Sequence, residues 1–219
     1  MDKAFWHARW QRREIGFHQQ RIHALLQRYW PKLDLPKESA VFVPLAGKSR
    51  DMAWLAAQGH RVIGVELSDV AVREFFEEGG LAPNSSAAGA FEIFSAGPFE
   101  LYCGDFFELT AGMLQDVVAV YDRAALIALP PEMRASYAEA LARILPRAAI
   151  IFLIAIDYPE GEITGPPFAV SSDEVHRLYG ASFEIELLES RDGLADSDNL
   201  KKRGVTRLEE TAYLLRRRS

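Results

Sequence analysis

The stretch AVFVPLAGKSRDMAWLAAQGHRVIGVELS at residues 40–68 decides the fold. An apolar run at 41–43 leads to a turn with one glycine, Gly47, and then to a helical pattern of apolar residues. A second apolar run at 62–65 ends on Glu66. This order predicts a strand, a turn, a helix and a second strand with a carboxylate at its tip. The spacing from Gly47 to Glu66 is about the 20 residues at which a nucleotide-binding α/β unit places the acid that binds two ribose hydroxyls.

The turn after the first strand has too few glycines to bind phosphate. Gly47-Lys48-Ser49 looks like the end of a phosphate-binding loop, but Phe42 stands where the first glycine of that motif would be. The three-glycine dinucleotide fingerprint is also absent, because Gly47 stands alone. A single glycine lets the backbone approach a ligand closely at one point only. This suits a ligand that has an adenosine but no pyrophosphate. S-adenosylmethionine is such a ligand.

The rest of the chain continues the alternation of strands and helices. Helices are expected from Asp69 as a cap to residue 78, over 132–145, and from Ser172 or Asp173 to residue 179. The loop at 83–97 has room for a short strand only, at 91–94. Further strands are expected at 99–103, 117–121, 150–156, 183–188 and 211–215. The pattern predicts an α/β fold with a doubly wound, mostly parallel seven-stranded sheet and helices on both faces.

Candidate binding residues follow the early strands, where ligands bind in such sheets. Glu66 is the first of these candidates. The alternative interpretation is that Glu66 is an ordinary solvated acid at the end of a strand. Asp105, or a backbone N–H beside it, would meet an adenine edge, with Phe106 against the face of the base. Arg123 is followed by apolar residues and needs an anionic or aromatic partner, for which Asp122 is the simplest alternative.

Composition narrows the class of protein and its partners. The 219 residues carry a formal net charge of −6, which gives no reason to expect nucleic acid or an anionic membrane surface as a partner. No apolar run approaches the ~18 residues of a membrane span, so we expect a cytoplasmic protein. The single cysteine, Cys103, has no evident base and is interpreted as structural. Because the five histidines are scattered, no metal is expected.

The chain ends suggest how the site is covered. Residues 3–29 are expected to form two helical pieces, and the first is dense in aromatic residues such as Trp10. Such a segment suggests a flap, with ordinary packing as the alternative. The long polar loop from Arg191 to Arg207 is of the kind that is often functional or mobile. Since no linker is evident, we expect one domain over residues 1–219, with residues 1–30 as a helical lid.

Several stretches, spread over nearly the whole chain, resemble a known family. They are FWHARW (5–10), IGFHQ (15–19), VPLAGKSRDMAWLAAQGHRVIGVELS (43–68), LYCGDFF (101–107), YDRAAL (121–126), GPPF (165–168) followed by Val170, TRLEE (206–210) and YLL (213–215). In these stretches the chain resembles the bacterial thiopurine S-methyltransferases, which are class I, Rossmann-like enzymes that depend on S-adenosylmethionine. The first and third stretches together are far more specific than any lone glycine motif.

The resemblance implies roles for particular residues. It implies that the methyl donor S-adenosylmethionine contacts Trp10, Leu45, Glu66 and Arg123, with Asp105 and Phe106 at the adenine. It places Phe17 beside the acceptor and makes the N-terminal helix a lid over the donor. The chain departs from the family at Ala46, where a cysteine is usual. Because the neighbouring Leu45 is expected to act through its backbone, donor binding should survive this change.

The implied activity is methyl transfer from S-adenosylmethionine to the sulfur of aromatic or heterocyclic thiols by a monomer. An aromatic thiol ionises readily, so alignment of donor and acceptor matters more than a strong base. Arg123 is the candidate for stabilising the thiolate. Two alternatives stay open: transfer to other small soft nucleophiles, such as alkyl thiols or selenium and tellurium species, and a non-catalytic adenosine-binding module.

Overall fold

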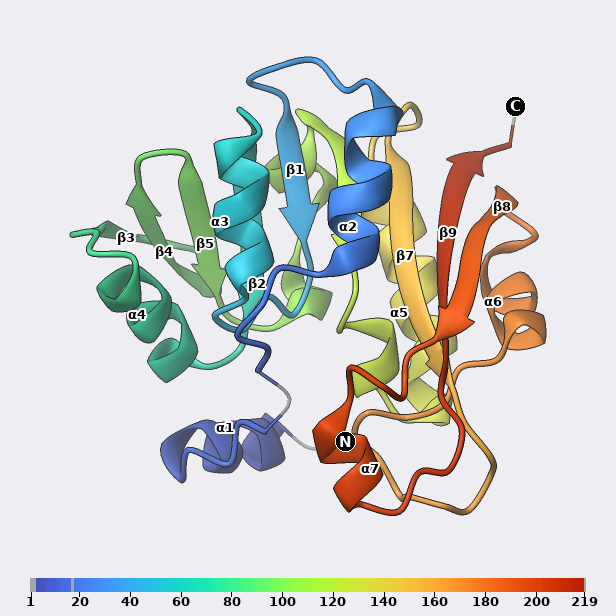
Figure 1. Ribbon diagram of the computed structural model, residues 1–219. Helices are drawn as coiled ribbons and strands as arrows, with labels where there is room; N and C mark the ends of the chain where they lie inside the picture. The colour runs from blue at the N-terminus through green and yellow to red at the C-terminus, as the bar shows by residue number, and fades with distance from the viewer. Residues whose placement is uncertain (1–2, 17, 219) are drawn as a thin grey trace. The chain divides into compact units, whose positions relative to one another are not determined.

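The computed structural model describes residues 3–16 and 18–218 of the chain. They belong to two compact units, Met1–Ala119 and Val120–Ser219. Figure 1 colours the first unit from blue to green and the second from yellow-green to red. The described residues form helices and nine strands, so the protein has an α/β fold with two strands more than the seven expected.

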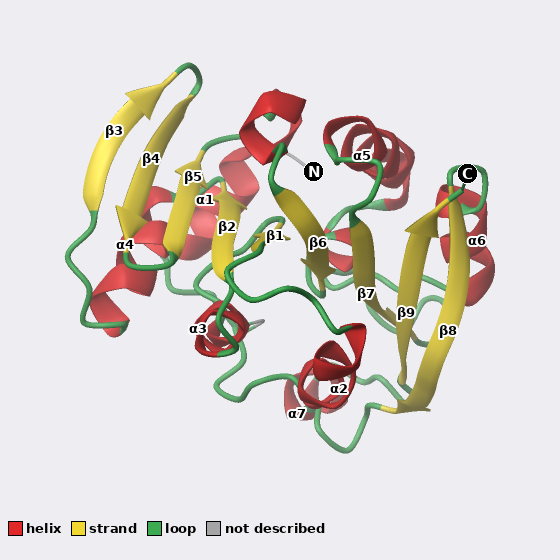
Figure 2. Cartoon of the chain, turned by 90° about the horizontal axis from the view of Figure 1, so that it is seen from above, coloured by secondary structure: helices red, strands yellow, loops and turns green. Residues whose placement is uncertain are grey.

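The first unit contains a parallel core of strands with an antiparallel extension. Its strands are ordered β3-β4-β5-β2-β1, as Figure 2 shows from above. β2 (Arg61–Glu66) pairs in parallel with both β1 (Ala40–Val43) and β5 (Phe99–Cys103). β4 (Phe91–Ala96) runs antiparallel to β5, and β3 (Asn84–Ala88) runs antiparallel to β4. The carboxyl ends of β1, β2 and β5 therefore share one edge, where the site residues were expected.

The hairpin of β3 and β4 replaces the loop expected at residues 83–97: β4 confirms the short strand expected at 91–94, and β3 was not expected. Asn84–Ala88 consists of small residues with low strand propensity, which gave no strand signal. Backbone pairing with β4 forms the strand instead, and Gly89 lies between the two strands with a positive φ of 60°. The prediction of seven strands was therefore wrong in number. The pairing is also antiparallel at the edge of the sheet that β3 and β4 form.

Serine side chains begin the two helices that follow β1 and β2. Ser49 Oγ accepts the backbone N–H two residues later at 3.2 Å and caps α3 (Arg50–Ala57). Ser68 Oγ accepts the N–H three residues later at 3.5 Å and caps α4 (Asp69–Glu78). The prediction of Asp69 as the cap of this helix was wrong by one residue. Asp69 occupies the first turn of α4, where a carboxylate favours the positive end of the helix dipole.

The N-terminal region forms two helices, α1 (Lys3–Gln11) and α2 (Ala24–Tyr29), which confirms the expected two pieces. Figure 1 shows α1 beside α4, against which it packs. The N–H of His23, which caps α2, donates to the buried carboxylate of Asp51 at 2.9 Å. That bond ties the second helix to the beginning of α3.

The second unit begins within β6 and ends with an antiparallel strand trio. β9 lies between β7 and β8 and is antiparallel to both. β8 extends four residues beyond its expected end, as part of the long pairing with β9. The elements are β6 (Val117–Asp122), α5 (Pro131–Ile144), β7 (Ile150–Asp157), α6 (Ser172–Tyr179), β8 (Phe183–Asp192), α7 (Asp198–Lys202) and β9 (Glu209–Arg217).

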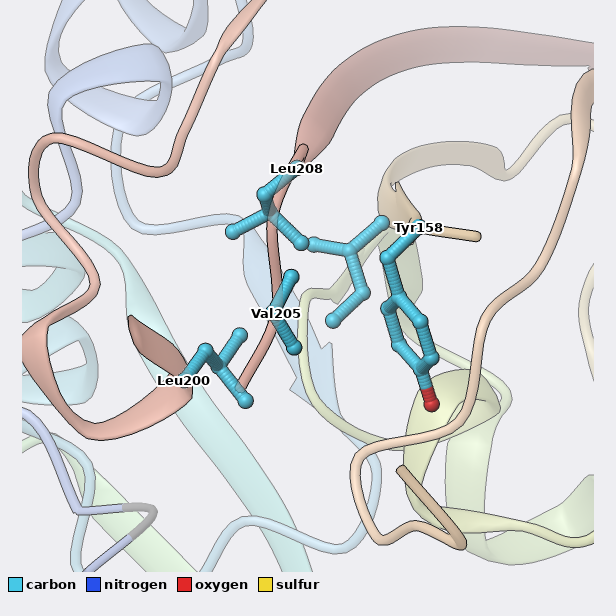
Figure 3. Close-up of a cluster of buried hydrophobic side chains, with 5 residues drawn as sticks. Tyr158, Leu200, Val205 and Leu208 are labelled. Atoms are coloured by element: carbon cyan, nitrogen blue, oxygen red, sulfur yellow. The ribbon is translucent and has the colours of Figure 1, made fainter. Parts of the chain in front are cut away.

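The late polar loop is anchored by a buried apolar cluster, drawn in Figure 3. The loop contains the short helix α7, and its apolar residues pack on the end of β7. The Tyr158 hydroxyl donates to the Pro167 carbonyl at 2.8 Å, and Arg203 Nη1 donates to the Pro166 carbonyl at 2.8 Å. These bonds tie the loop at residues 165–168 to Tyr158 of the cluster and to Arg203, which follows α7. The cluster consists of Ile156, Tyr158, Leu200, Val205 and Leu208.

His60 forms a buried polar contact between elements of the first unit. Trp30 Nε1–H donates to His60 Nε2 at 3.1 Å, and Ser39 Oγ lies 3.1 Å from Nδ1. The Trp30 bond requires a lone pair on Nε2, so it is made by the neutral imidazole. Burial lowers the pKa of His60, because the charged ring would lose its hydration.

We therefore expect part of the acid sensitivity of the protein to come from His60. Between its lowered folded pKa and the ordinary value of about 6.5, the unfolded chain binds a proton that the folded protein does not. The free energy of unfolding should fall as the pH drops below about 6.5. Urea unfolding of His60→Gln across this range should show a shallower fall than the parent. Parallel curves for the two proteins would contradict this role.

Candidate functional site

The Glu66 carboxylate is buried at the carboxyl end of β2 and bridges two backbone segments. Its Oε2 accepts the Gly47 N–H at 2.9 Å, and its Oε1 accepts the Ser68 N–H at 2.9 Å. Only 7% of the residue is exposed. One side chain therefore joins the turn after β1 to the beginning of α4.

The environment of Glu66 suits a ligand with two hydroxyl donors. Burial raises the pKa of the carboxyl, and the neighbouring backbone N–H groups of Ser68, Gly47 and Leu67 oppose that shift. An ionised carboxylate accepts about four hydrogen bonds and donates none. After the two bonds to Gly47 and Ser68, each oxygen retains a lone pair. A vicinal diol such as a ribose matches this acceptor set.

The turn between β1 and α3 is tight and is covered by an indole. Leu45 and Gly47 have positive φ values of 47° and 54°, and the Ala46 N–H donates to the Val65 carbonyl at 2.9 Å. A Cβ added at Gly47 would lie 3.3 Å from Cζ2 of Trp10. Trp10 itself is 3% exposed. The sequence-predicted residues Trp10 and Leu45 thus lie at the same turn that donates to Glu66, and glycine is required where the indole approaches.

The segment after β5 brings two more expected residues to the same edge. The Gly104 N–H donates to the main-chain carbonyl of Glu66 at 2.9 Å. The next residue, Asp105, forms an ion pair with Lys3 of α1 at 2.7 Å. Phe106 is buried and stacks on Phe42 with ring centroids 6.5 Å apart, so its ring belongs to the core of the unit.

The remaining expected residues lie elsewhere. Phe17 is outside the described residues. Arg123 belongs to the second unit and is half-buried directly after β6. Its expected alternative partner, Asp122, is instead engaged by the Tyr137 hydroxyl at 2.7 Å and by the N–H groups of Ala125 and Leu126 at 3.2 Å each. In the described part of the second unit, no ion pair joins Arg123 to Asp122.

Asp122 anchors the segment that carries Arg123. Burial raises the pKa of Asp122 to about 6, against the opposing effect of the bonds from Tyr137, Leu126 and Ala125. A carboxylate that caps the turn after a strand fixes the backbone on both sides of Arg123. The sequence indicated this position only as the end of an apolar run.

Sequence reasoning missed two residues that shape the site. The backbone N–H of Ser68 was not considered as a donor to Glu66, although a serine two residues after a strand-end acid is a cap signal. Lys48 was considered only as a phosphate ligand, and it is buried in an ion-pair cluster with α4. No local pattern indicates those partners, which come 26 and 30 residues later.

Other chemistries find little support among residues 3–16 and 18–218. No group of three or more histidine, cysteine, aspartate or glutamate side chains in this part of the chain could hold a metal ion. None of its helices is long and apolar enough to cross a membrane. Cys103 lies opposite Glu66 in the pairing of β5 with β2. Burial, together with nearby carboxylates, raises the pKa of its thiol to about 11.

Two solved methyltransferases have the same fold. The 1,6-didemethyltoxoflavin-N1-methyltransferase of Burkholderia thailandensis, solved with S-adenosylhomocysteine, gives a TM-score of 0.65 at 14% identity over 99% of this chain and 87% of that chain. A SAM-dependent methyltransferase from Anabaena variabilis gives 0.63 at 14% identity over 99% of this chain and 95% of that chain. The fold is therefore that of the class I, S-adenosylmethionine-dependent methyltransferases.

The sequence comparisons identify the family. The family described as Thiopurine S-methyltransferase (TPMT) matches residues 1–218. The thiopurine S-methyltransferase of Xanthomonas axonopodis pv. citri is 50% identical over 218 residues, which cover 100% of both chains. That of Pseudomonas fluorescens is 49% identical over 216 residues, 99% of each chain. The chain belongs to the thiopurine S-methyltransferase family, and it is an enzyme that uses S-adenosylmethionine.

We expect the Cys103 thiol to be unreactive in the folded enzyme. With a pKa of about 11, only about one thiol in a thousand is ionised at pH 8, and the thiolate is the nucleophile. Alkylation by iodoacetamide at pH 8, followed by mass spectrometry, should be far slower than for the same protein unfolded in urea. Equal rates in the two states would show that the site is open and its thiol ordinary.

Proposed function

We propose that this protein transfers the methyl group of S-adenosylmethionine to the sulfur of thiopurines and related aromatic or heterocyclic thiols. The observation that carries the proposal is the buried Glu66 carboxylate, held by the N–H groups of Gly47 and Ser68 with lone pairs left for a ribose diol. The relatives at about half identity, each named thiopurine S-methyltransferase, support the choice of acceptor. When bound, S-adenosylmethionine supplies a methyl group on a sulfonium, already activated for in-line displacement.

The first unit provides the groups that would bind the donor. Glu66 would accept hydrogen bonds from both ribose hydroxyls, which fixes the adenosine at the end of β2. The Leu45 backbone, in its left-handed conformation, would line the turn beside the sulfonium. Asp105 would meet the edge of the adenine. Trp10, which already covers Gly47, would keep water from the donor.

The helical segment at residues 1–30 would act as a lid over this donor site. Two contacts support the assignment within the first unit: the Trp10 indole against Gly47, and the Lys3–Asp105 ion pair at 2.7 Å. Because Lys3 is exposed, that ion pair contributes little stability and can open readily. We take residues 1–219 as one methyltransferase domain that works in the cytoplasm as a monomer.

The acceptor would be bound by other groups. Phe17 is assigned to the acceptor by the family resemblance alone. Arg123 would stabilise the developing thiolate, and the cap by Asp122 holds its backbone in place. A permanently charged guanidinium suits this role, since it stays protonated while the acceptor ionises. No strong general base is needed for an acceptor that reacts as a thiolate.

Donor affinity should depend on Glu66. Glu66→Ala should weaken S-adenosylmethionine binding by ~1–3 kcal/mol, because two ribose hydroxyls lose their acceptor. Affinity for the parent protein should fall at acid pH, since a protonated carboxyl accepts fewer bonds. Because burial raises the pKa of Glu66, this loss should begin at a higher pH than for an ordinary glutamate. Calorimetric titrations at several pH values measure both effects.

Glu92→Ala is the matched control, since Glu92 is an exposed acid on β4 of the same unit. It should bind the donor as the parent does at every pH. A folded Glu66→Ala protein with an unchanged dissociation constant would reject the donor site. Absence of any binding by the parent at millimolar donor would reject the function.

Turnover should depend on Arg123. Arg123→Ala should lower kcat with 6-mercaptopurine by about tenfold or more, because less of the bound thiol is ionised to the thiolate when no cation lies beside it. The assay uses labelled donor and a panel of 6-mercaptopurine, thiophenol, 2-mercaptoethanol and selenite. Higher kcat/KM on the first two supports the proposal. Preference for the last two favours a methyltransferase for other soft nucleophiles, and binding without any transfer favours a non-catalytic module.

The exposed Arg147, also in the second unit, supplies the control for Arg123. Arg147→Ala removes the same charge from the same unit and should leave kcat unchanged. If Arg123→Ala has the kinetics of this control on both aromatic thiols, Arg123 has no part in the reaction.

A further inference from the structure

Lys48 shares the turn with Leu45 and Gly47. Its buried ammonium is bound by two carboxylates of α4, the partly buried Glu74 and the exposed Glu78. Lys48 Nζ lies 2.6 Å from Glu74 Oε2 and 2.6 Å from Glu78 Oε1, and the lysine side chain is 7% exposed. The two glutamates are four residues apart on α4, so they face the same side of the helix. Without the cation between them, they would repel one another.

The charge of Lys48 is retained despite its burial. Burial disfavours the ammonium, but the hydrogen bonds and charges of Glu74 and Glu78 outweigh that effect, and the pKa of Lys48 is raised. A buried ion pair adds little net stability compared with an apolar side chain of similar size. It does restrict geometry, because the buried ammonium must stay within reach of both carboxylates on α4.

Lys48 and Gly47 hold the turn at two separate points. The Gly47 N–H donates to Glu66, at the end of β2, and Lys48 reaches α4, which begins after Ser68. Between β1 and these two anchors, Leu45 adopts a positive φ of 47°, which is uncommon for a residue with a side chain. Such a conformation persists only where surrounding contacts determine it. The ion pairs of the neighbouring Lys48 are contacts of this kind.

The same cluster reaches the N-terminal segment. Arg13, two residues beyond α1, places Nη2 3.7 Å from Glu74 Oε1. Arg13 is exposed, so this contact is weak and screened by salt. Glu74 thus receives a buried cation from the donor turn and an exposed cation from the segment that carries Trp10.

We propose that Lys48 is a positioning residue for donor binding, which pins the turn to α4 so that Leu45 and Gly47 keep the conformation that accepts S-adenosylmethionine. The inference rests on the proposed donor site at Glu66 and adds a residue outside that site. It also gives the Gly47-Lys48-Ser49 sequence a function that requires no phosphate. The cation acts on the protein and makes no contact with the ligand.

The test separates donor affinity from the chemical step. Lys48→Met keeps the length of the side chain and removes its charge, so the turn should sample other conformations. Donor affinity falls in proportion to the fraction of molecules whose turn is in the conformation that binds the donor. If that fraction is about one in ten, the dissociation constant rises about tenfold. Calorimetry should show that rise. At saturating donor, kcat and the thiol KM should stay within about twofold of the parent, as for a loss of ground-state binding.

Two variants show whether the charge is responsible. Lys48→Arg keeps a cation between the glutamates and should restore the donor dissociation constant to within about threefold of the parent. Lys37→Met removes an exposed lysine from the same unit and should bind the donor like the parent. If Lys48→Met fails to fold, the double variant Glu74→Gln/Glu78→Gln, which removes both charged acceptors, is measured instead with the same expectation.

The outcomes distinguish this inference from the proposed function. A folded Lys48→Met protein whose donor dissociation constant is unchanged overturns the inference, as does one in which Lys48→Arg binds no better than Lys48→Met. If Glu66→Ala still weakens binding in the same titration, the donor site stands and only the role of Lys48 is lost. If neither Lys48→Met nor Glu66→Ala changes the affinity, the donor site itself is wrong.

Discussion

The buried carboxylate of Glu66 is the interaction on which the first unit depends. Its charge loses hydration, and the N–H groups of Gly47 and Ser68 offset much of that loss. The bond to Gly47 fixes the turn after β1, and the bond to Ser68 fixes the beginning of α4. The acceptor capacity that remains after these two bonds favours a ligand with hydroxyl donors. A single side chain thereby serves the fold and, on our proposal, the donor.

The parts of the fold that could be predicted are those with local signals. β5 begins and ends where its apolar run does, and α5 begins beside a proline pair that suits a first helical turn. β3 could not be predicted, because Asn84–Ala88 has no apolar alternation and becomes a strand only through its partner. β3 therefore comes from tertiary pairing, which a single sequence does not display.

The residues of the site also divide into those that a local sequence signal predicts and those that only tertiary contacts reveal. Glu66 was predictable because the strand before it, the glycine upstream and their spacing all lie within one short stretch. Trp10 entered through the family resemblance, since its contact with Gly47 joins residues far apart in the chain. Lys48 was left without a role for the same reason: once phosphate was excluded, the acids that bind it, 26 and 30 residues later, gave no local signal.

Donor and acceptor recognition use different kinds of support. The turn proposed to bind the donor depends on backbone N–H groups and buried charges within the first unit. Arg123, in the second unit, extends from a segment held by Asp122, whose bonds go to Tyr137 and to backbone N–H groups and leave the guanidinium free of that acid. If Arg123 binds the acceptor as proposed, substitutions around it should change acceptor preference without disturbing the bonds of Glu66. The substitution of Ala46 for the usual cysteine fits this division, because the backbone of that turn is what Glu66 and Val65 hold.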